Sequence, residues 1–339
     1  MVLCQKHIAN GRARAIVVNS GCANACTGEQ GLEDAREMAN LAAKRLGLAA
    51  EDVLVASTGV IGRRLPIELI ARGIDKVAFS REGGHELAQA ILTTDTGTKE
   101  IALAVEGFTI GGIAKGAGMI HPNLATLLCF LATDAAIEAR FLKKALREAV
   151  DVSFNMITID GDTSPNDTVL ILANGIAGND VIKQGTSRAA AFQQALTEVC
   201  TYLAKRIAGD GEGATKLIEV TVEGALTPAD ARVAARTIVG SPLVKAAIHG
   251  CDPNWGRIIA ALGRSGAEVD GSKIGLFLNN ISLMAKGSAL PFDRDEARAA
   301  MKGEVVPIRV RLNLGGSAAT AWGCDLSAGY VAINSEYTT

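Results

Sequence analysis

The stretch KGAGMIHPNLATLLCF, residues 115–130, decides the fold, because a glycine-rich turn leads there into an apolar run. Residues 127–132 are typical of a buried strand, and the Pro-Asn pair before them indicates a tight turn. Thr126 stands between that turn and the strand. Threonine is common at strand starts and turn edges, so its residue type alone predicts nothing more than the start of a strand.

The chain around this stretch mixes strands and helices without strict alternation. Up to residue 213, hydrophobic periodicity predicts strands at 14–19, 52–58, 101–105, 108–110, 127–132 and 168–173, and helices at 27–46, 66–72, 86–92, 136–150 and 187–207. After it, the pattern predicts strands at 217–222, 274–278, 307–312, 320–326 and 330–334, and helices at 228–238, 257–262 and 294–301. We therefore expect an α+β fold of stacked layers, not a doubly wound parallel sheet. The expected domains are a main one, residues 1–213, and a smaller β-rich one, residues 214–339.

Composition narrows the function classes. Hydrophobic residues make up 48% of the 339 residues and aromatic residues 4%, so the core must be built mainly from small aliphatic side chains. The net charge is −2 and the isoelectric point is about 6.1, which argues against a nucleic-acid partner or an acidic membrane surface. No apolar stretch reaches the length of a membrane span.

The chain has seven cysteines, an odd number, and no pair with the spacing CxxC. Reduced thiols are typical of cytoplasmic proteins, so we expect a cytoplasmic location. Cys22 and Cys26 have a spacing that metal sites use, but no second pair of ligands follows them. Small buried thiols are the better interpretation, and the sequence predicts no metal site.

Two short motifs allow a plain structural interpretation beside a functional one. Residues 56–62, ASTGVIG, end a strand at a glycine turn, but the Thr58 hydroxyl and Gly59 amide would also suit an oxyanion hole. Residues 209–214, GDGEGA, match a dinucleotide-binding pattern, yet a helix precedes them and a strand follows, which is the wrong order. A helix end followed by a turn fits better, and Glu212 could there present its carboxylate to an ammonium group.

The four histidines form no recognisable triad or metal motif. His121 precedes Thr126 by five residues and is best interpreted as a turn residue. A hydroxyl nucleophile would therefore need another base, which an N-terminal threonine supplies through its own α-amine. In residues 154–168, the spacing of Asp160, Asp162, Asn166 and Asp167 does not match a calcium loop, so Asx-turns are expected there.

Eight motifs occur together in one order along nearly the whole chain: NSGCANACTG, STGVIG, TTDT, KGAGMIHPNLATLL, DGDTSPNDT, GDGEGATK, DPNWGR and INSEYTT. With these motifs the chain resembles the ornithine acetyltransferase family, the glutamate N-acetyltransferases of arginine biosynthesis. The resemblance implies an α/β/β/α-type layered fold with a smaller C-terminal domain. It also implies that the chain cleaves itself between Ala125 and Thr126, giving an alpha chain of residues 1–125 and a beta chain of residues 126–339. Two copies of each would form a heterotetramer.

The reaction implied by the resemblance moves acetyl from N-acetylornithine to glutamate through an acetyl-Thr126 intermediate. Acetyl-CoA is a further candidate donor, and no cofactor is expected. Thr58 and Gly59 would form the oxyanion hole. The implied substrate-binding residues are Thr93, Lys115, Thr126, Glu212, Asn334 and Thr339. Lys115 and the hydroxyls suit a carboxylate, whereas Glu212 suits an ammonium group.

Two alternatives stay open at this point. An aminopeptidase or amidohydrolase with a self-generated N-terminal nucleophile would give the acyl group to water. A non-catalytic relative would bind amino acids without transferring a group. The apolar start of the chain, Met1 to Cys4, resembles a strand. Members of the family usually have a further segment before this point. We therefore expect a longer natural protein and a bare sheet edge or groove near residues 1–20.

Overall fold

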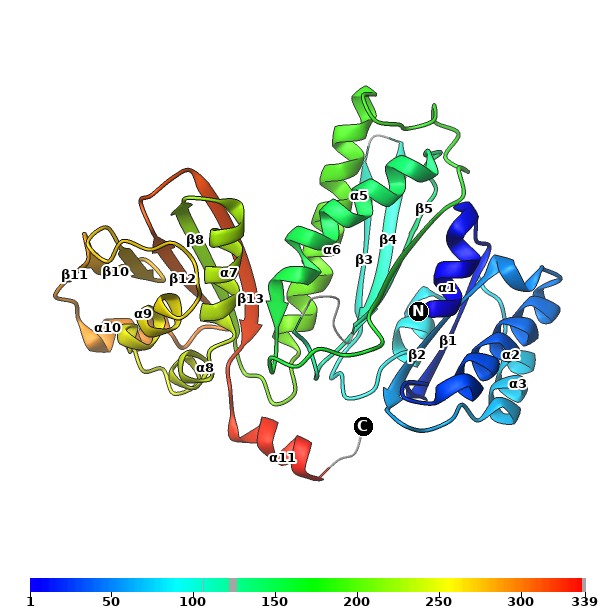
Figure 1. Cartoon of the computed structure of the whole chain (residues 1–339), viewed down its shortest axis with the longest axis horizontal. Helices are drawn as coiled ribbons and strands as arrows, with labels where there is room; N and C mark the ends of the chain where they lie inside the picture. Colours follow the sequence, from blue (N-terminus) through cyan, green and yellow to red (C-terminus); the bar gives the residue numbers. More distant parts are fainter. Residues whose placement is uncertain (106, 122–126, 337–339) are drawn as a thin grey trace.

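The computed structural model describes residues 1–105, 107–121 and 127–336. Figure 1 shows four layers side by side on the N-terminal side and a second, separate sheet beyond them. The described strands of the chain are β1 (Ala15–Cys22), β2 (Val53–Val60), β3 (Lys99–Val105), β4 (Phe108–Lys115), β5 (Leu128–Thr133), β6 (Ile157–Thr158), β7 (Thr168–Ala173), β8 (Leu217–Ala225), β9 (Gly275–Leu278), β10 (Ile281–Ala285), β11 (Ser288–Ala289), β12 (Val305–Arg311) and β13 (Ser317–Cys324). Its α-helices are α1 (Val2–His7), α2 (Gly28–Leu46), α3 (Ile67–Lys76), α4 (Gly84–Ala90), α5 (Ala139–Val152), α6 (Ser187–Gly209), α7 (Pro228–Val239), α8 (Pro242–His249), α9 (Trp255–Gly263), α10 (Arg294–Ala300) and α11 (Ala328–Glu336).

The central sheet has the order β3-β4-β5-β7. β4 runs antiparallel to both β3 and β5, whereas β7 runs parallel to β5. The predicted strands at 101–105 and 108–110 are confirmed as β3 and β4, which pair as a hairpin. The apolar run after Thr126 is confirmed as β5, which lies between two other strands and is buried along most of its length.

A pair of parallel strands, β1 and β2, packs on one face of this sheet. The contact is made by small and branched apolar side chains: Ile16, Val18, Ala56, Ile113, Leu128, Phe130 and Leu170. Helices α2 and α3 cover the outer face of the pair, where Met38 and Leu54 are fully buried. The predicted strand at 14–19 is confirmed as β1, which pairs with β2 alone among the described strands and is mostly half-buried.

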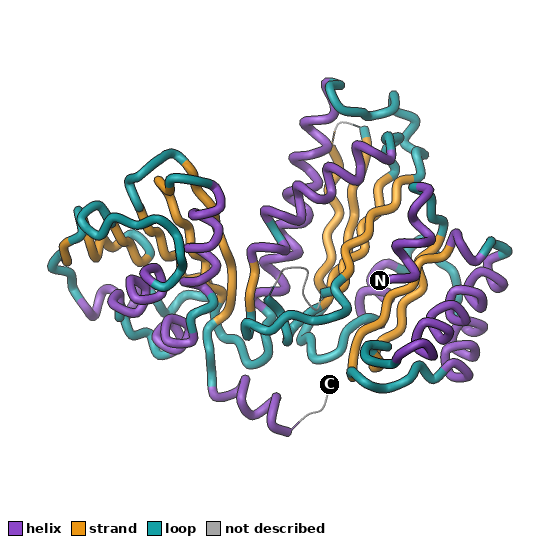
Figure 2. Tube along the Cα trace, in the orientation of Figure 1, coloured by secondary structure: helices purple, strands orange, loops and turns teal. Residues whose placement is uncertain are grey.

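Helices α5 and α6 cover the opposite face of the central sheet (Figure 2). Phe192 of α6 is fully buried and lies 5.6 Å from Phe108 and 6.4 Å from Phe141, measured between ring centroids. The predicted α/β/β/α layering and the α+β class are therefore confirmed.

The second sheet has seven strands in the order β11-β10-β9-β12-β8-β13-β6. Helix α7 packs on β8 and β13, whereas α6 contacts both this sheet and the central one. The short strand β6 pairs with β13, so this sheet includes residues that precede the predicted domain boundary. The boundary itself, between residues 213 and 214, stays a prediction.

Two predicted strands are helices instead. The predicted strand at 330–334 is wrong, because these residues belong to α11. The Ser327 hydroxyl accepts a hydrogen bond from the Gly329 amide at 3.0 Å, which favours a helix start, and Val331 is 64% exposed, so no sheet face buries it. The prediction of a strand at the start of the chain is also wrong, because these residues form α1, whose Leu3 and Cys4 pack against β2.

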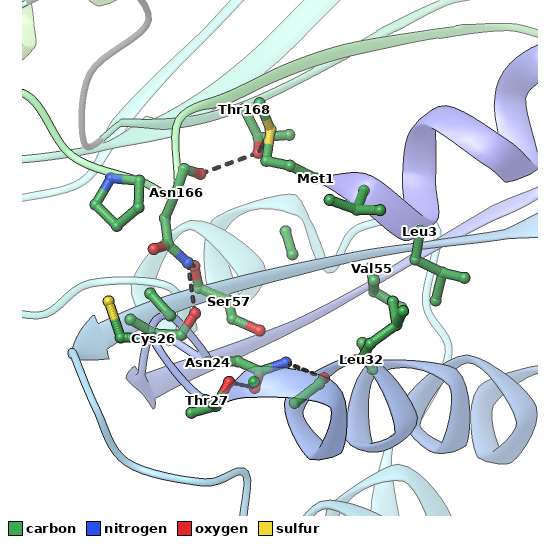
Figure 3. Close-up of a pocket in the computed structure, with 18 residues that line it drawn as sticks. Met1, Leu3, Asn24, Cys26, Thr27, Leu32, Val55, Ser57, Asn166 and Thr168 are labelled. Carbon is green, nitrogen blue, oxygen red and sulfur yellow. Dashed lines mark hydrogen bonds between the residues drawn. The ribbon is translucent and has the colours of Figure 1, made fainter.

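A cavity of about 320 Å³ lies between Met1, the start of α2 and the segment around Asn166 (Figure 3). It lies in the region where the sequence predicted a groove. The Thr27 hydroxyl, just before α2, donates to Asn24 and caps no α2 amide. None of the described helices combines the length and hydropathy needed to cross a membrane.

Candidate active site

One cavity of about 90 Å³ collects six residues that the sequence singled out: Thr58, Gly59, Thr93, Lys115, Glu212 and Asn334. They come from the end of β2, the segment after α4, the end of β4, the segment after α6 and from α11. Residues separated by more than 270 positions are therefore brought together. Ala125, Thr126 and Thr339, which complete the predicted site, lie outside the described residues.

Gly59 is required by the close approach of β1 and β2. Its φ angle is +123°, a conformation that side chains other than glycine rarely adopt. A Cβ atom on Gly59 would lie 2.3 Å from the carbonyl carbon of Gly21, its partner in the strand pair. Gly59 lies within β2 instead of ending it, so the interpretation as a plain β-turn is wrong.

Lys115 lies at the centre of the cavity wall and is 3% exposed. Its Nζ donates to the Thr93 hydroxyl at 2.8 Å and to the Thr58 hydroxyl at 3.4 Å. Because Lys115 donates to the Thr58 oxygen, the hydroxyl hydrogen of Thr58 remains available to another acceptor. Burial lowers the pKa of Lys115, and the charge of Asp95 opposes this shift.

Asp95 is a site residue that the sequence analysis missed, although it lies inside the TTDT motif. Its carboxylate accepts hydrogen bonds from the Lys99 ammonium at 2.7 Å and from the Gly116 amide at 2.6 Å. It also lies 3.6 Å from the Lys115 Nζ. Burial raises the pKa of Asp95, but the charges of the two lysines outweigh it and hold that pKa below its usual value. Asp95 thus balances two buried cations and fixes the turn that follows Lys115.

Glu212 lines the same cavity as Lys115 and is 7% exposed. Its amide donates to the Ala117 carbonyl at 2.8 Å, and its carboxylate accepts from the Asn334 side chain at 2.8 Å. A Cβ atom on Gly118 would lie 2.6 Å from the Glu212 carboxylate, so glycine is needed there. The predicted turn at residues 209–214 therefore presents a carboxylate to the cavity.

The loop between β4 and the predicted cleavage point is bound to Asp160. This carboxylate accepts from the amides of Met119 at 2.5 Å and Ile120 at 2.9 Å. Met119 has a φ angle of +55°, which costs about 1–2 kcal/mol for a residue other than glycine. Asp160 also accepts from the Asp162 amide at 3.3 Å, so one predicted Asx-turn is confirmed.

Asp167 contacts the residue that follows Thr126 in the sequence. Its Oδ1 accepts from the Leu127 amide at 2.8 Å, while its buried Oδ2 has no hydrogen-bond partner among the described residues. Burial raises the pKa of Asp167 from 3.8 to about 8. Its neighbour Asn166 donates to the carbonyls of Ala23 and Ser57, which ties this loop to the β1–β2 pair (Figure 3). Both residues therefore make contacts across the fold, not the local turns that the sequence predicted.

The arrangement suits a small amino acid, with a lysine ammonium on one side and a carboxylate on the other. The hydroxyl groups of Thr58 and Thr93 line the same cavity and both accept from Lys115. Among the described residues no group of His, Cys, Asp and Glu side chains could hold a metal ion. Cys22 is buried and its thiol donates to carbonyls of Arg63 and Arg64, whereas Cys26 is exposed. The interpretation of Cys26 as a buried thiol is therefore wrong.

The family model of the ArgJ family matches residues 1–339. The chain belongs to the ArgJ family. The arginine biosynthesis bifunctional protein ArgJ of Dehalococcoides mccartyi is 56% identical to this ArgJ-family chain, over 96% of this chain and 82% of the relative. The protein of the same name from Symbiobacterium thermophilum is 53% identical, over 100% of this chain and 86% of the relative. A crystal structure of ArgJ from Bacillus halodurans superposes with a TM-score of 0.59 at 45% identity, covering 60% of this chain and 96% of that one.

Family membership confirms the predicted function class. This ArgJ-family chain is a bifunctional acetyltransferase of arginine biosynthesis, an ornithine acetyltransferase and glutamate N-acetyltransferase. The hydrolase and the non-catalytic relative are thereby set aside. The roles of individual site residues remain predictions.

The raised pKa of Asp167 predicts a pH-dependent stability. The folded state keeps a proton that the unfolded chain releases above about pH 4, so stability should fall as the pH rises towards about 8 and then level off. Asp167→Asn keeps an acceptor for the Leu127 amide but cannot ionise. We expect this variant to have a flatter dependence of Tm on pH, measured by thermal unfolding between about pH 5 and about pH 9.

Asp180→Asn is the matched control, because Asp180 is exposed and the same charge is removed. This control should follow the wild-type pH dependence. An Asp167→Asn variant whose Tm falls with pH as steeply as that of the wild type would contradict the assignment.

Proposed function

We propose that Thr126 is the nucleophile of this acetyltransferase and that the described cavity binds the amino-acid part of its substrates. The observation that carries the proposal is the cavity that brings Thr58, Gly59, Lys115 and Glu212 together from separate elements. Support for Thr126 comes from its neighbour Leu127, which is 2% exposed and is held by Asp167.

The first step is self-cleavage. The Thr126 hydroxyl attacks the carbonyl carbon of Ala125, the peptide bond breaks, and an ester links the two pieces until water opens it. The α-amine of Thr126 is thereby released and serves as the base for its own hydroxyl. The positive φ of Met119 and its bond to Asp160 support this step, since a constrained turn limits how the following chain can approach.

Acetyl transfer then takes place in two halves. The Thr126 hydroxyl attacks the acetyl carbonyl of N-acetylornithine and gives its proton to the α-amine, which passes it to the departing ornithine amine. The glutamate amine next attacks the acetyl ester and leaves as N-acetylglutamate. Each tetrahedral intermediate bears an oxyanion, which the Thr58 hydroxyl and Gly59 amide would stabilise. Acetyl-CoA is the second donor that the bifunctional activity requires.

The charged side chains that line the cavity would orient the charged groups of the amino-acid substrate. Lys115, with Thr93 beside it, would bind the substrate carboxylate, and Glu212, held by Asn334, would bind an ammonium group. Thr339 completes the proposed set of substrate-binding residues. We further propose a heterotetramer of two alpha and two beta chains and a cytoplasmic location, which the seven unpaired cysteines support.

Self-cleavage predicts two pieces in the purified protein, residues 1–125 and 126–339. Intact-mass spectrometry under denaturing conditions should detect both, whereas Thr126→Ala should give one full-length chain, because alanine has no hydroxyl to attack with. A wild-type preparation that remains one chain and is active would show that the mechanism is wrong.

A single nucleophile that serves two substrates predicts double-displacement kinetics. With N-acetylornithine and glutamate varied together, double-reciprocal plots should give parallel lines. An acetyl adduct should form on the piece that begins at Thr126 when glutamate is omitted. Intersecting lines, or steady release of acetate without glutamate, would exclude the proposed transfer.

The oxyanion assignment predicts a large effect of Thr58→Ala on turnover. Loss of one such donor commonly costs about 3 kcal/mol of transition-state stabilisation, so kcat should fall about a hundredfold or more. Thr94→Ala is the control, because Thr94 lines the same cavity and has no proposed role. Equal losses in the two variants would assign Thr58 to packing instead.

A further inference from the structure

A second cavity, of about 750 Å³, lies beside α7 and shares none of the six residues of the amino-acid cavity. Four basic side chains line it: His121, Arg232, Arg236 and Arg264. We call it the basic cavity. Arg232 and Arg236 belong to α7, and Arg264 directly follows α9. His121 belongs to the loop after β4.

The buried face of α7 fixes the direction of these arginines. Ala231, Ala234, Ala235, Ile238 and Val239 are fully buried, and the helix packs on β8 and β13 with that face. Arg232 and Arg236 are one turn apart and therefore share a face, which flanks the buried one and leaves both side chains half-buried. The same face continues to Pro228 and Gly240, which also line the basic cavity.

Basic side chains dominate the described lining of this cavity. None of its described lining residues is acidic. Like charges one turn apart on a helix repel each other. Burial, and then the charge of Arg232, lower the pKa of Arg236. Arg232 lies 4.0 Å from Asp151, but both side chains are partly exposed, so this pair contributes little. A bound anion would remove the repulsion.

His121 is held as a neutral imidazole in the wall of the basic cavity. The Thr158 hydroxyl donates to the Ile120 carbonyl at 3.2 Å and can therefore accept from the His121 Nδ1–H at 3.0 Å. Arg236 Nη2 donates to His121 Nε2 at 3.2 Å. Burial, and then the charge of Arg236, lower the pKa of His121, which keeps the ring an acceptor. The interpretation of His121 as a simple turn residue is therefore wrong, since it orients an arginine.

One short loop connects the two cavities. Gly118 and Met119 line the amino-acid cavity, and His121 lines the basic cavity. The loop between them is fixed by the bonds from Met119 and Ile120 to Asp160. An elongated ligand can thus place one end in each cavity.

We propose that the basic cavity binds the phosphate groups of acetyl-CoA while its thioester end extends to the amino-acid cavity. This inference rests on the proposed function, in which acetyl-CoA is the second donor. Among the substrates, acetyl-CoA alone carries phosphates, and arginine side chains bind phosphate oxygens through two parallel hydrogen bonds. N-acetylornithine and glutamate have no group that needs three arginines outside the amino-acid cavity.

The test compares the two donor reactions in Arg232→Gln and Arg264→Gln. Each variant should raise the KM for acetyl-CoA about tenfold, because a charge-assisted hydrogen bond is lost. The N-acetylornithine reaction reports on folding and on the amino-acid cavity, and its KM and kcat should stay near the wild-type values. Arg298→Gln removes the same charge from the exposed face of α10, outside the basic cavity, and should change neither reaction.

Ligand truncation in the wild type tests the same assignment without a variant. Calorimetry should show that CoA binds more tightly than 3′-dephospho-CoA, and pantetheine more weakly than either. Raised salt should weaken CoA binding more than pantetheine binding. Inorganic phosphate should compete with CoA only weakly, because it lacks the rest of the donor. Phosphate that binds as tightly as CoA would identify a free anion as the occupant and overturn the proposal.

Two further results separate failure of this inference from failure of the proposed function. A wild type that uses acetyl-CoA, together with variants whose KM for acetyl-CoA is unchanged, would refute the basic cavity alone. A wild type that neither uses acetyl-CoA nor binds CoA would refute both. An equal loss in the two donor reactions would give the arginines a structural role and would also contradict the inference.

Discussion

The rest of the site depends on the ion pairs that the buried Asp95 carboxylate makes with two lysines. This carboxylate binds the Lys99 ammonium, lies near that of Lys115 and accepts the Gly116 amide. Lys99 in turn binds Asp210, two positions before Glu212. An isolated buried ammonium would lose its proton or destabilise the fold, so each charge here requires its partners. This network links the strand with Lys115 to the turn with Glu212 and thereby sets the distance between cation and carboxylate across the cavity.

Two further aspartates flank the segment between residues 121 and 127. Asp160 binds the amides of Met119 and Ile120 before it, and Asp167 binds the amide of Leu127 after it. Both come from the loop between β6 and β7. The backbone on either side of the predicted cleavage point is thus fixed by one loop, which makes that loop part of the chemistry although it contributes no residue with a predicted catalytic role.

The loop that begins at Gly118 also relates the two binding regions to each other. Its first residues allow the Glu212 carboxylate to approach closely, and its last described residue, His121, orients Arg236. Selection between two donors then has a simple physical basis. Under the proposals above, both donors would deliver the same acetyl group to one nucleophile. Their dissimilar remainders would be recognised in separate cavities, one lined by both charge signs and one lined by basic side chains.

The sequence by itself determined the class of fold, most strands and helices, the family and six of the residues that line the cavity. It did so because hydrophobic periodicity is local and because the motifs occur in one fixed order. Tertiary structure decided the rest. Residues 330–334 have the β-branched pattern of a strand, but no sheet edge receives them, and a helix instead brings Asn334 to Glu212. The contacts of Asp95 with Gly116, of Asp167 with Leu127 and of His121 with Arg236 were not predictable, since they join residues 21, 40 and 115 positions apart. Such contacts are set by packing of the layers, which no local pattern of residue types encodes.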